Sequence, residues 1–503
     1  MTTPDVTGGL PSTAVLNPVG GGLPTGGPPA GDPPTPEEAA APPGGVPTTG
    51  AVPGTGAVPT TAAVPASGAV PTTGAASLPG AVPTTGAMPA AGLPTGQPAA
   101  FSPEMARRDF PILHRTVNGH PLVWLDNGAT TQKPRQVIEA VAGFYGAANS
   151  NIHRGAHTMA REATEAYEGG RAAVAQFLGA ASPDDIVFVR GTTEAINLVA
   201  QTWGRANLGP GDDILVPVLE HHSNIVPWQL IAKETRARVV PVPLQADGRI
   251  DLDKYADLLS MRTQLVAISQ ASNVLGTVPP VKEMTALAHR YGAKVLVDGA
   301  QAVAHFPVDV QDLDADFYVF SGHKLFAPTG IGALYAKPEI LQQMTPWQGG
   351  GNMIESVDFG RTTFAPVPHL LEAGTGHISG VVGMLAALNW LTAFDRDAIA
   401  AYETSLMAYA QQALATVPGL EVIGSAPERI AVLTFTLAGH DPAEIAAWLD
   451  RDGIAIRAGH HCAQPALAHY GLESAARASL ALYNTSEEVD QLVASLHRLQ
   501  QAT

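Results

Sequence analysis

The side chain best suited to covalent chemistry is Cys462, the only cysteine among 503 residues. It lies in the run Arg457-Ala-Gly-His-His-Cys-Ala-Gln-Pro465, where two histidines precede the thiol and Gly459 lets the chain bend. A small buried core residue is the alternative interpretation of a single cysteine. The polar neighbours favour instead a loop that presents a nucleophilic thiol.

A second reactive group is Lys324, at the end of the run Ser321-Gly-His-Lys324. The apolar stretch Phe317–Phe320 precedes this run. A lysine that is desolvated in such a setting has a lowered pKa and can act as an amine nucleophile, as a Schiff base with a carbonyl cofactor requires. A solvated surface lysine is the alternative.

A candidate phosphate site lies earlier in the chain, at Gly191-Thr-Thr-Glu194. Free N–H groups at a helix start, together with the hydroxyls of Thr192 and Thr193, would suit a phosphate group. The same residues also fit an ordinary helix-capping pattern.

Two more polar runs could complete a cofactor site. Asp298 could hold a ring nitrogen or a metal, or it could cap the next helix, and His221 lies in a run that could also be a surface turn. A phosphate cradle, an acid for a pyridinium nitrogen, a histidine that stacks on a ring and a Schiff-base lysine are the parts that pyridoxal 5′-phosphate (PLP) requires. A metal site agrees less well with the sequence, because the histidines and acids form no compact ligand set and there is no second cysteine.

These polar runs follow apolar segments that predict β-strands. Helical patterns such as residues 281–291 lie between most of them, which predicts a mostly parallel sheet covered on both faces. Ligands in such sheets bind at the carboxyl ends of the strands. The predicted strands are Asp185–Arg190, Asp213–Val218, Gln264–Ser269, Lys294–Asp298 and Phe317–Ser321.

The charge and composition exclude several classes of partner. A formal net charge of −17 argues against nucleic acid and anionic membranes, and no apolar run approaches the ~20 residues of a membrane span. A single cysteine excludes an intramolecular disulfide, and the chain opens with no secretory leader, so we expect a cytoplasmic location.

The composition changes sharply near Phe101. Residues 1–100 contain no Lys, Arg or aromatic residue and carry a proline-rich hexad of the type Gly-Ala-Val-Pro-Thr-Thr, which predicts a disordered, extended tail. A flexible linker and an interaction tail are both open for this segment. We expect residues 101–119 to form an arm that packs with a small C-terminal domain over 390–503, and residues 120–389 to form a large PLP-binding domain.

From about Met105 onward the sequence resembles the fold-type I, class V PLP enzymes, and in detail the group II (SufS-like) cysteine desulfurases. The resemblance implies an α/β fold: a large domain with a mostly parallel seven-stranded sheet between helices, and a smaller α+β C-terminal domain. The motifs that carry it are Leu125-Asp-Asn-Gly-Ala-Thr130, Asn151-Ile-His-Arg-Gly155, Val189-Arg-Gly-Thr-Thr-Glu194, Glu220-His-His-Ser-Asn-Ile-Val-Pro-Trp228, Ser272-Asn-Val-Leu-Gly-Thr277, Val297-Asp-Gly-Ala-Gln301, Ser321-Gly-His-Lys324, Arg457-Ala-Gly-His-His-Cys462 and Arg477-Ala-Ser-Leu-Ala-Leu-Tyr-Asn484.

The resemblance also implies the reaction and its residues. L-cysteine would become L-alanine, with the sulfur retained as a persulfide on Cys462, and Lys324 would bind PLP and then act as the general base at the substrate Cα. The other implied contacts are Asp298 with the pyridine nitrogen, Gln301 with the ring hydroxyl, His221 stacked on the ring, Thr192, Thr193, Ser321 and His323 with the phosphate, Asn273 with cofactor and substrate, and Arg477 and Arg457 with the substrate.

Partners follow from the same resemblance. Family members are homodimers that borrow site residues across the interface, and the matching stretches here are His153-Arg154 and Glu372-Ala-Gly-Thr375. The short cysteine loop marks the group that needs a sulfur-acceptor protein. Two residues depart from the family pattern: Gly376 follows Thr375 where proline is common, and Gly128 stands where alanine is common.

Other functions are also compatible with the sequence. A selenocysteine lyase shares the architecture, and a free cytosolic desulfurase could supply iron–sulfur cluster assembly with residues 1–100 as a mere linker. Those residues also resemble, in composition, length and position, the N-terminal extensions that load desulfurases as cargo into encapsulin shells, which would place the enzyme inside a protein compartment.

Overall fold

The computed structural model describes residues 92–94 and 96–502. The predicted disordered tail over residues 1–100, with its proposed role as a linker or a loading segment, therefore lies almost entirely outside the described residues.

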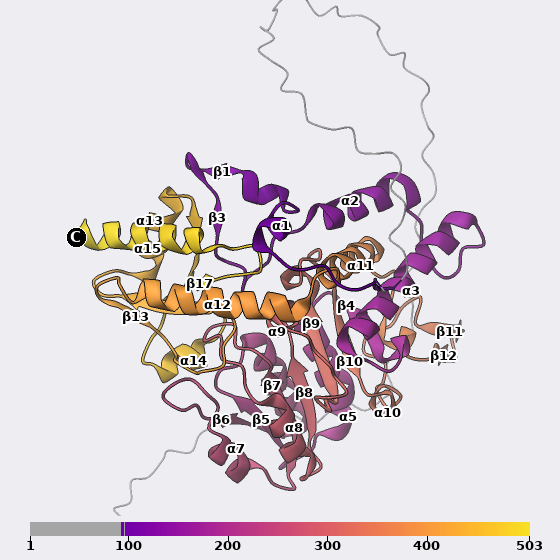
Figure 1. Ribbon diagram of the computed structural model, residues 1–503. Coiled ribbons are helices and arrows are strands. Elements are labelled where there is room, and N and C mark those ends of the chain that lie inside the picture. Colours follow the sequence, from indigo (N-terminus) through magenta and orange to yellow (C-terminus); the bar gives the residue numbers. More distant parts are fainter. Residues whose placement is uncertain (1–91, 95, 503) are drawn as a thin grey trace, which may run out of the picture. The chain divides into compact units, whose positions relative to one another are not determined.

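A seven-stranded sheet forms the centre of the fold (Figure 1). Its strand order is β4-β10-β9-β8-β7-β5-β6, and every neighbouring pair is parallel except those that involve β10. Because β10 is antiparallel to both β4 and β9, those two strands run in the same direction, and the carboxyl ends of six strands meet at one edge. The strands are β4 Ile186–Val189, β5 Asp213–Pro217, β6 Arg238–Val242, β7 Thr263–Ser269, β8 Lys294–Asp298, β9 Phe317–Ser321 and β10 Gly332–Ala336.

Helices cover both faces of this sheet because successive strand residues point to opposite sides. In β8, Val295 and Val297 join a core with α3, α8 and α11, whereas Leu296 joins a second core with α4 and α6. Both faces are therefore apolar, as a buried parallel sheet requires. The helices of this part are α2 Arg135–Gly143, α3 Thr158–Leu178, α4 Thr192–Val199, α5 Arg205–Asn207, α6 Val226–Thr235, α7 Leu252–Leu258, α8 Val281–His289, α9 Ala302–His305, α10 Pro338–Leu341 and α11 Ile378–Thr392.

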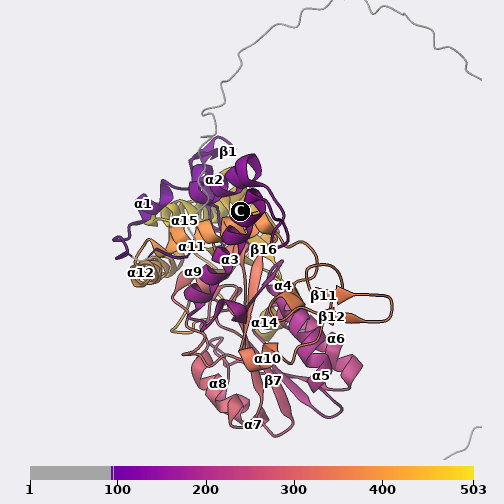
Figure 2. The same ribbon diagram turned by 90° about the vertical axis from the view of Figure 1, so that its right-hand side faces the viewer.

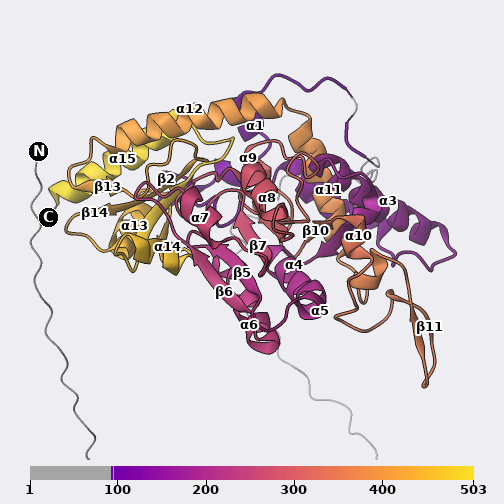
Figure 3. The same cartoon turned by 90° about the horizontal axis from the view of Figure 1, so that it is seen from below.

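The C-terminal part is built around an antiparallel four-stranded sheet of order β13-β14-β17-β16. The long helices α12 and α15 pack against each other over it (Figures 1 and 3). Its elements are α12 Arg396–Leu414, β13 Leu420–Val422, β14 Val432–Leu437, α13 Pro442–Arg451, β15 Ile454–Ala455, β16 Arg457–Gly459, α14 Gln464–His469, β17 Ala475–Ser479 and α15 Ser486–Gln501.

The residues before the large sheet contact this C-terminal part. Arg107, in α1 (Pro103–Arg107), forms a 2.7 Å ion pair with Glu488, and its guanidinium donates to the carbonyl of Tyr483. After the hairpin of β1 (Thr116–Val117) and β2 (His120–Pro121), strand β3 (Val123–Trp124) pairs in parallel with β15.

A second hairpin, β11 (Ile354–Val357) with β12 (Thr362–Phe364), projects away from the sheet (Figures 2 and 3). Its tip exposes Val357 and Phe359. No helix among the residues that the structure describes is long and apolar enough to cross a membrane.

The fold confirms the predicted class. The five predicted strands are β4, β5, β7, β8 and β9, each within two residues of its predicted ends, and the helix predicted over residues 281–291 is α8. The remaining strands, β6 and β10, were not singled out, and β10 is the strand that makes the sheet mixed rather than parallel throughout.

Candidate active site

A cavity of about 170 Å³ opens at the carboxyl edge of the large sheet, between that sheet and the C-terminal part. It brings together every predicted site residue except Thr375 and His153. The predicted residues that line it are Thr192, Thr193, His221, Asn273, Asp298, Gln301, Ser321, His323, Lys324, Arg457, Cys462 and Arg477.

The predicted phosphate cradle is the start of α4, directly after β4. Gly191 is the N-cap and supplies no side-chain cap, while Glu194 Oε2 accepts from the Arg190 N–H at 2.6 Å, a part of the capping alternative. The Thr192 N–H donates to Ser321 Oγ at 2.9 Å. A Cβ at Gly191 would lie 3.0 Å from that same oxygen, and Gly191 has φ +154°, so only glycine lets the β4 and β9 ends approach this closely.

Lys324 ends the short turn Gly322–Lys324 that follows β9, and its side chain lines the cavity. Burial lowers the pKa of its ammonium from 10.5 to about 8; Asp298 opposes this shift, and Arg477 adds to it. The lowered pKa increases the fraction of neutral amine near physiological pH, and the neutral amine is the form that a nucleophile or a general base requires.

The backbone beside Lys324 is held by a set of donors that the sequence did not reveal. The carbonyl of His323 accepts from Lys133 Nζ at 2.8 Å, from Thr130 Oγ1 at 3.0 Å and from the Thr131 N–H at 3.1 Å. Burial lowers the pKa of Lys133 to about 7. This anchor fixes the turn from which Lys324 extends.

Asp298 ends β8 and is almost fully buried. Its Oδ1 accepts from the Ala300 N–H at 2.9 Å. Burial raises the pKa of this carboxyl, while the Ala300 N–H and Lys324 oppose the shift. Gln301 Nε2 donates to the Gly128 carbonyl at 2.8 Å, so its amide carbonyl oxygen remains available in the cavity.

His221 follows β5 and lines the cavity beside Lys324. Burial, with Lys324 as the next cause, lowers its pKa to about 3, so the ring is neutral at physiological pH. Its Nδ1 accepts from the Ser223 N–H at 3.0 Å, which leaves the proton on Nε2. The neighbouring Glu220 is fully buried, and burial raises its pKa to about 8; the sequence analysis assigned it no role in the site.

Arg477, in β17, is 1% exposed, and its fork is only partly used. Nη1 donates to the Asn273 carbonyl at 2.8 Å and Nη2 to Asp126 Oδ1 at 3.1 Å, whereas the buried Nε has no partner among the described residues. Arg457 Nε lies 3.7 Å from Asp126 Oδ2. Asp126, which sequence reasoning missed, therefore positions both arginines.

Cys462 lies in the loop between β16 and α14 and is half-buried. His461 and Cys462 have φ values of +50° and +55°, a left-handed conformation that costs free energy in residues with a Cβ. The loop is fixed by the Asn273 amide, which donates to the His461 carbonyl at 2.7 Å, and by the His222 N–H, which donates to the Cys462 carbonyl at 2.7 Å.

Thr375 and His153 lie away from this cavity. Thr375 lines a larger cavity of about 600 Å³ with Tyr167, Trp347 and other residues. His153 Nε2 lies 2.8 Å from Glu168 Oε1, and its Nδ1 lies 3.3 Å from Asn352 Oδ1. Within one chain, neither residue lines the cavity that contains the Lys324 side chain.

A family model described as Aminotransferase class-V matches residues 123–492. The chain belongs to the class-V aminotransferase family. A "Cysteine desulfurase" of Synechococcus elongatus is 55% identical over 400 residues, which cover 80% of this chain and 64% of the relative. A "Probable cysteine desulfurase" of Mycolicibacterium paratuberculosis is 54% identical over 393 residues, covering 78% of this chain and 57% of the relative.

Two shorter relatives are spanned almost completely. A "Cysteine desulfurase" of Escherichia coli O127:H6 is 50% identical over 400 residues, 79% of this chain and 98% of the relative. The crystal structure of the cysteine desulfurase CsdA (S-sulfonic acid) from Escherichia coli superposes with a TM-score of 0.75 at 43% identity and covers 80% of this chain and all of that chain.

PLP is the cofactor of class-V aminotransferases, and the cavity fits it. The fit rests on the donor set: an amine with a lowered pKa, a buried carboxyl, a neutral imidazole and a glycine-capped helix start that all face one cavity. Lys324 would bind the cofactor covalently, and Asp298 would contact its ring nitrogen. Its phosphate would lie against Thr192, Thr193 and Ser321.

Proposed function

We propose that this chain is a cysteine desulfurase that moves the sulfur of L-cysteine onto Cys462 as a persulfide and releases L-alanine. The observation that carries the proposal is that the only thiol of the chain lines the same cavity as Lys324 and Arg477. The reaction balances without an oxidant, because a thiol and L-cysteine together contain the atoms of a persulfide and L-alanine.

Arg477 supports binding of the substrate carboxylate. Its buried Nε has no partner among the described residues and can donate to a carboxylate, while Asp126 and the Asn273 carbonyl hold the rest of the fork. A Cβ at Gly128 would lie 3.1 Å from the guanidinium carbon, so Gly128 leaves this face of the arginine open.

Lys324 supports proton removal at the substrate Cα. With a pKa of about 8, its neutral form can take that proton and give it back elsewhere. When bound, PLP supplies an acceptor for the electron pair that the Cα–H bond leaves behind.

Cys462 supports the sulfur transfer. Its thiolate would attack the substrate sulfur, so that the S–S bond forms, the C–S bond breaks, and the electron pair of that bond goes to the former Cβ, which takes a proton to become the methyl group of alanine. His221 is the neutral group with an Nε2–H that we assign to proton movement in the cavity.

Alanine formation tests this function directly. The PLP-bound parent and Cys462→Ala are incubated with L-cysteine, and alanine and protein persulfide are measured with and without a reductant. We expect both products from the parent alone; equal alanine from the variant would overturn the role of Cys462. L-selenocysteine in the same assay tests the alternative, because a selenocysteine lyase would cleave it equally well in Cys462→Ala.

We also propose a homodimer in which His153 and Thr375 of one chain serve the cavity of the other. Support comes from Thr375, which lines a separate, larger cavity that a second chain could complete, and from His153, whose ring centroid lies 5.9 Å from that of Tyr167 in the same lining. Mixed refolding of Lys324→Ala with Thr375→Ala subunits tests it: if the site is shared between subunits, mixed dimers contain one intact site and regain activity that neither parent variant has.

Two further partners remain proposals. A sulfur-acceptor protein would take the persulfide from the half-buried Cys462. Residues 1–100 would load the enzyme into an encapsulin shell in the cytoplasm, a proposal that rests on their Pro, Gly and Ala content. Deleting residues 1–100 should abolish copurification with a shell protein and leave turnover nearly unchanged. If the truncated enzyme still copurified with the shell protein, residues 1–100 would be only a linker.

A further inference from the structure

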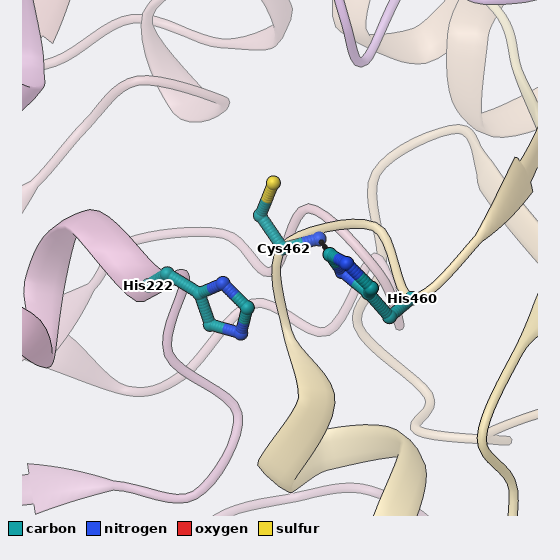
Figure 4. Close-up of side chains that lie close together, drawn as sticks. All are labelled: His222, His460 and Cys462. Carbon is teal, nitrogen blue, oxygen red and sulfur yellow. Dashed lines mark hydrogen bonds between the residues drawn. The ribbon is translucent and has the colours of Figure 1, made fainter.

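Three potential metal ligands converge at the outer side of the cysteine loop. Donor atoms of His222, His460 and Cys462 all lie within 4.8 Å of one another. In Figure 4 the two imidazole rings flank the Cys462 backbone, and the thiol points away from both. The sequence could not predict this cluster, because His222 follows β5, whereas the other two residues belong to the loop after β16.

Backbone hydrogen bonds hold the three residues in place. The His222 N–H donates to the Cys462 carbonyl at 2.7 Å, and His222 Nε2 accepts from the Gln464 N–H at 3.2 Å. The Cys462 N–H donates to His460 Nδ1 at 3.0 Å, the dashed line of Figure 4. The centroids of the two rings are 5.5 Å apart, so the cluster is preorganised around Cys462.

The chemistry of this set is specific. One thiolate with two imidazoles suits Zn²⁺ and related thiophilic ions, whereas Ca²⁺ and Mg²⁺ require oxygen ligands. Three protein ligands with an open fourth position are typical of an accessible zinc site. The His222 Nε2 lone pair now accepts from the Gln464 N–H at 3.2 Å, so a metal bound at this nitrogen would replace that donor.

The geometry needs only a local adjustment. Ligand bonds of about 2.0 to 2.3 Å place the donors of a tetrahedral zinc ion about 3.4 to 3.6 Å apart, so the donors must close by roughly 1 Å from their present limit of 4.8 Å. Rotation of Cys462 about its Cα–Cβ bond brings the sulfur toward the rings. The exposed ring of His460 leaves the ion a path from solvent.

We propose that His222, His460 and Cys462 form a three-ligand site for Zn²⁺ or another thiophilic divalent ion. The thiol proton goes to solvent when the metal–sulfur bond forms, and water fills the fourth position. Lys324, Arg457 and Arg477 line the adjoining cavity and repel a dication, so the thiolate charge contributes more to binding than either imidazole does.

One consequence rests on the proposed function. While the ion holds Cys462 as a thiolate, the sulfur cannot attack the substrate, so the ion acts as a reversible inhibitor of sulfur transfer. Removing the ion with a chelator should restore alanine formation, since no bond of the chain is broken.

Cobalt absorption provides a direct test on the full-length, PLP-bound protein freed of metal. A sulfur-to-Co²⁺ charge-transfer band can arise only from Cys462, because the chain has no other cysteine. We expect one equivalent of Co²⁺ to produce the band, Zn²⁺ to displace it, and Cys462→Ser to abolish it. His222→Ala and His460→Ala should each weaken Co²⁺ affinity at least about tenfold.

The matched control is His469→Ala, which removes an exposed histidine of α14 close to the loop and should leave Co²⁺ affinity unchanged. Thermal unfolding and cofactor absorbance establish that each variant is folded. Absence of the band in the parent, or undiminished affinity in both histidine variants, would overturn the site.

The cobalt measurement needs no turnover, which separates the two proposals. If the parent binds Co²⁺ through sulfur but makes no alanine, the metal site is supported and the proposed desulfurase function is contradicted. If the parent makes alanine but shows no charge-transfer band, the proposed function is supported and the metal site is contradicted.

Discussion

The two sides of the cavity are built in opposite ways. Asp298 ends the buried strand β8 and is itself buried, with its carboxyl held by the Ala300 N–H. Lys324 follows the buried strand β9 in a turn whose His323 carbonyl is held by Lys133. Cys462 lies on a half-buried loop in a left-handed backbone conformation, fixed by contacts with the segments after β5 and β7. Under the proposed function, the rigid sheet edge serves the cofactor and the proton, and the loop serves the sulfur, which must leave the cavity for an acceptor.

The largest expected effect distinguishes the sheet side of the cavity from the cysteine loop by whether a variant still binds PLP. Lys324→Ala should lose both the visible absorbance of covalently bound PLP and alanine formation, by at least about 10²- to 10⁴-fold, the range for a lost general base. Cys462→Ala should lose alanine formation and keep the absorbance. If Cys462→Ala also lost the cofactor, the two sides would not be functionally separate.

The next effect tests Arg477, which connects the C-terminal sheet to the cavity. Arg477→Lys keeps a charge but removes the fork, and the loss of a charge-assisted hydrogen bond of about 1.5 to 3 kcal/mol should lower kcat/KM by about 10- to 150-fold. The change should fall mainly on KM, as measured by initial rates over a range of L-cysteine. An unchanged KM would place the carboxylate elsewhere.

The pH dependence of the free energy of unfolding tests how strongly burial disfavours the charged form of Lys324. Between pH 8 and 10.5 the unfolded chain binds more protons at Lys324 than the folded chain, so the free energy of unfolding of the cofactor-free protein should rise with pH in this window. Over the whole window, the shifted pKa of Lys324 changes the free energy of unfolding by on the order of 3 kcal/mol. Denaturant unfolding at several pH values measures it.

The matched variants for that measurement are Lys324→Met and Lys233→Met. Lys324→Met should reduce the rise and leave the part that comes from Lys133, whose pKa burial lowers to about 7. Lys233→Met removes an exposed lysine and should leave the rise unchanged. A rise of undiminished size in Lys324→Met would assign the pH dependence to other groups.

The smallest effect concerns Gly128, which lies against the guanidinium of Arg477. A Cβ there would lie 3.1 Å from the guanidinium carbon of Arg477, so Gly128→Ala should crowd the arginine and raise KM a few-fold, as expected for about 1 kcal/mol of overpacking. Gly146→Ala is the control, since its Cβ would meet no atom within 4 Å. Equal KM values for both variants would show that the arginine accommodates the methyl group.

Sequence patterns predicted the sheet side of the site better than its surroundings. Lys324, Asp298 and His221 each follow an apolar strand, and parallel strands bring such ends to one edge whatever the details of packing. Asp126, Lys133 and Glu220 carried no comparable signal. Their partners are Arg477, the His323 carbonyl and Ser269, which lie far away in the chain, and only packing brings those groups within bonding distance.

The amino-acid sequence by itself determined the fold class, the segments of the chain that form the strands carrying the site, and the identity of the only thiol. These features depend on local hydrophobic pattern and residue type. Tertiary structure alone decided that Cys462 faces the cavity of Lys324, that two histidines from separate segments flank it, and that Thr375 does not reach the cavity within one chain. These distances depend on how loops cross between the sheet and the C-terminal part, and no pattern along the chain encodes that crossing.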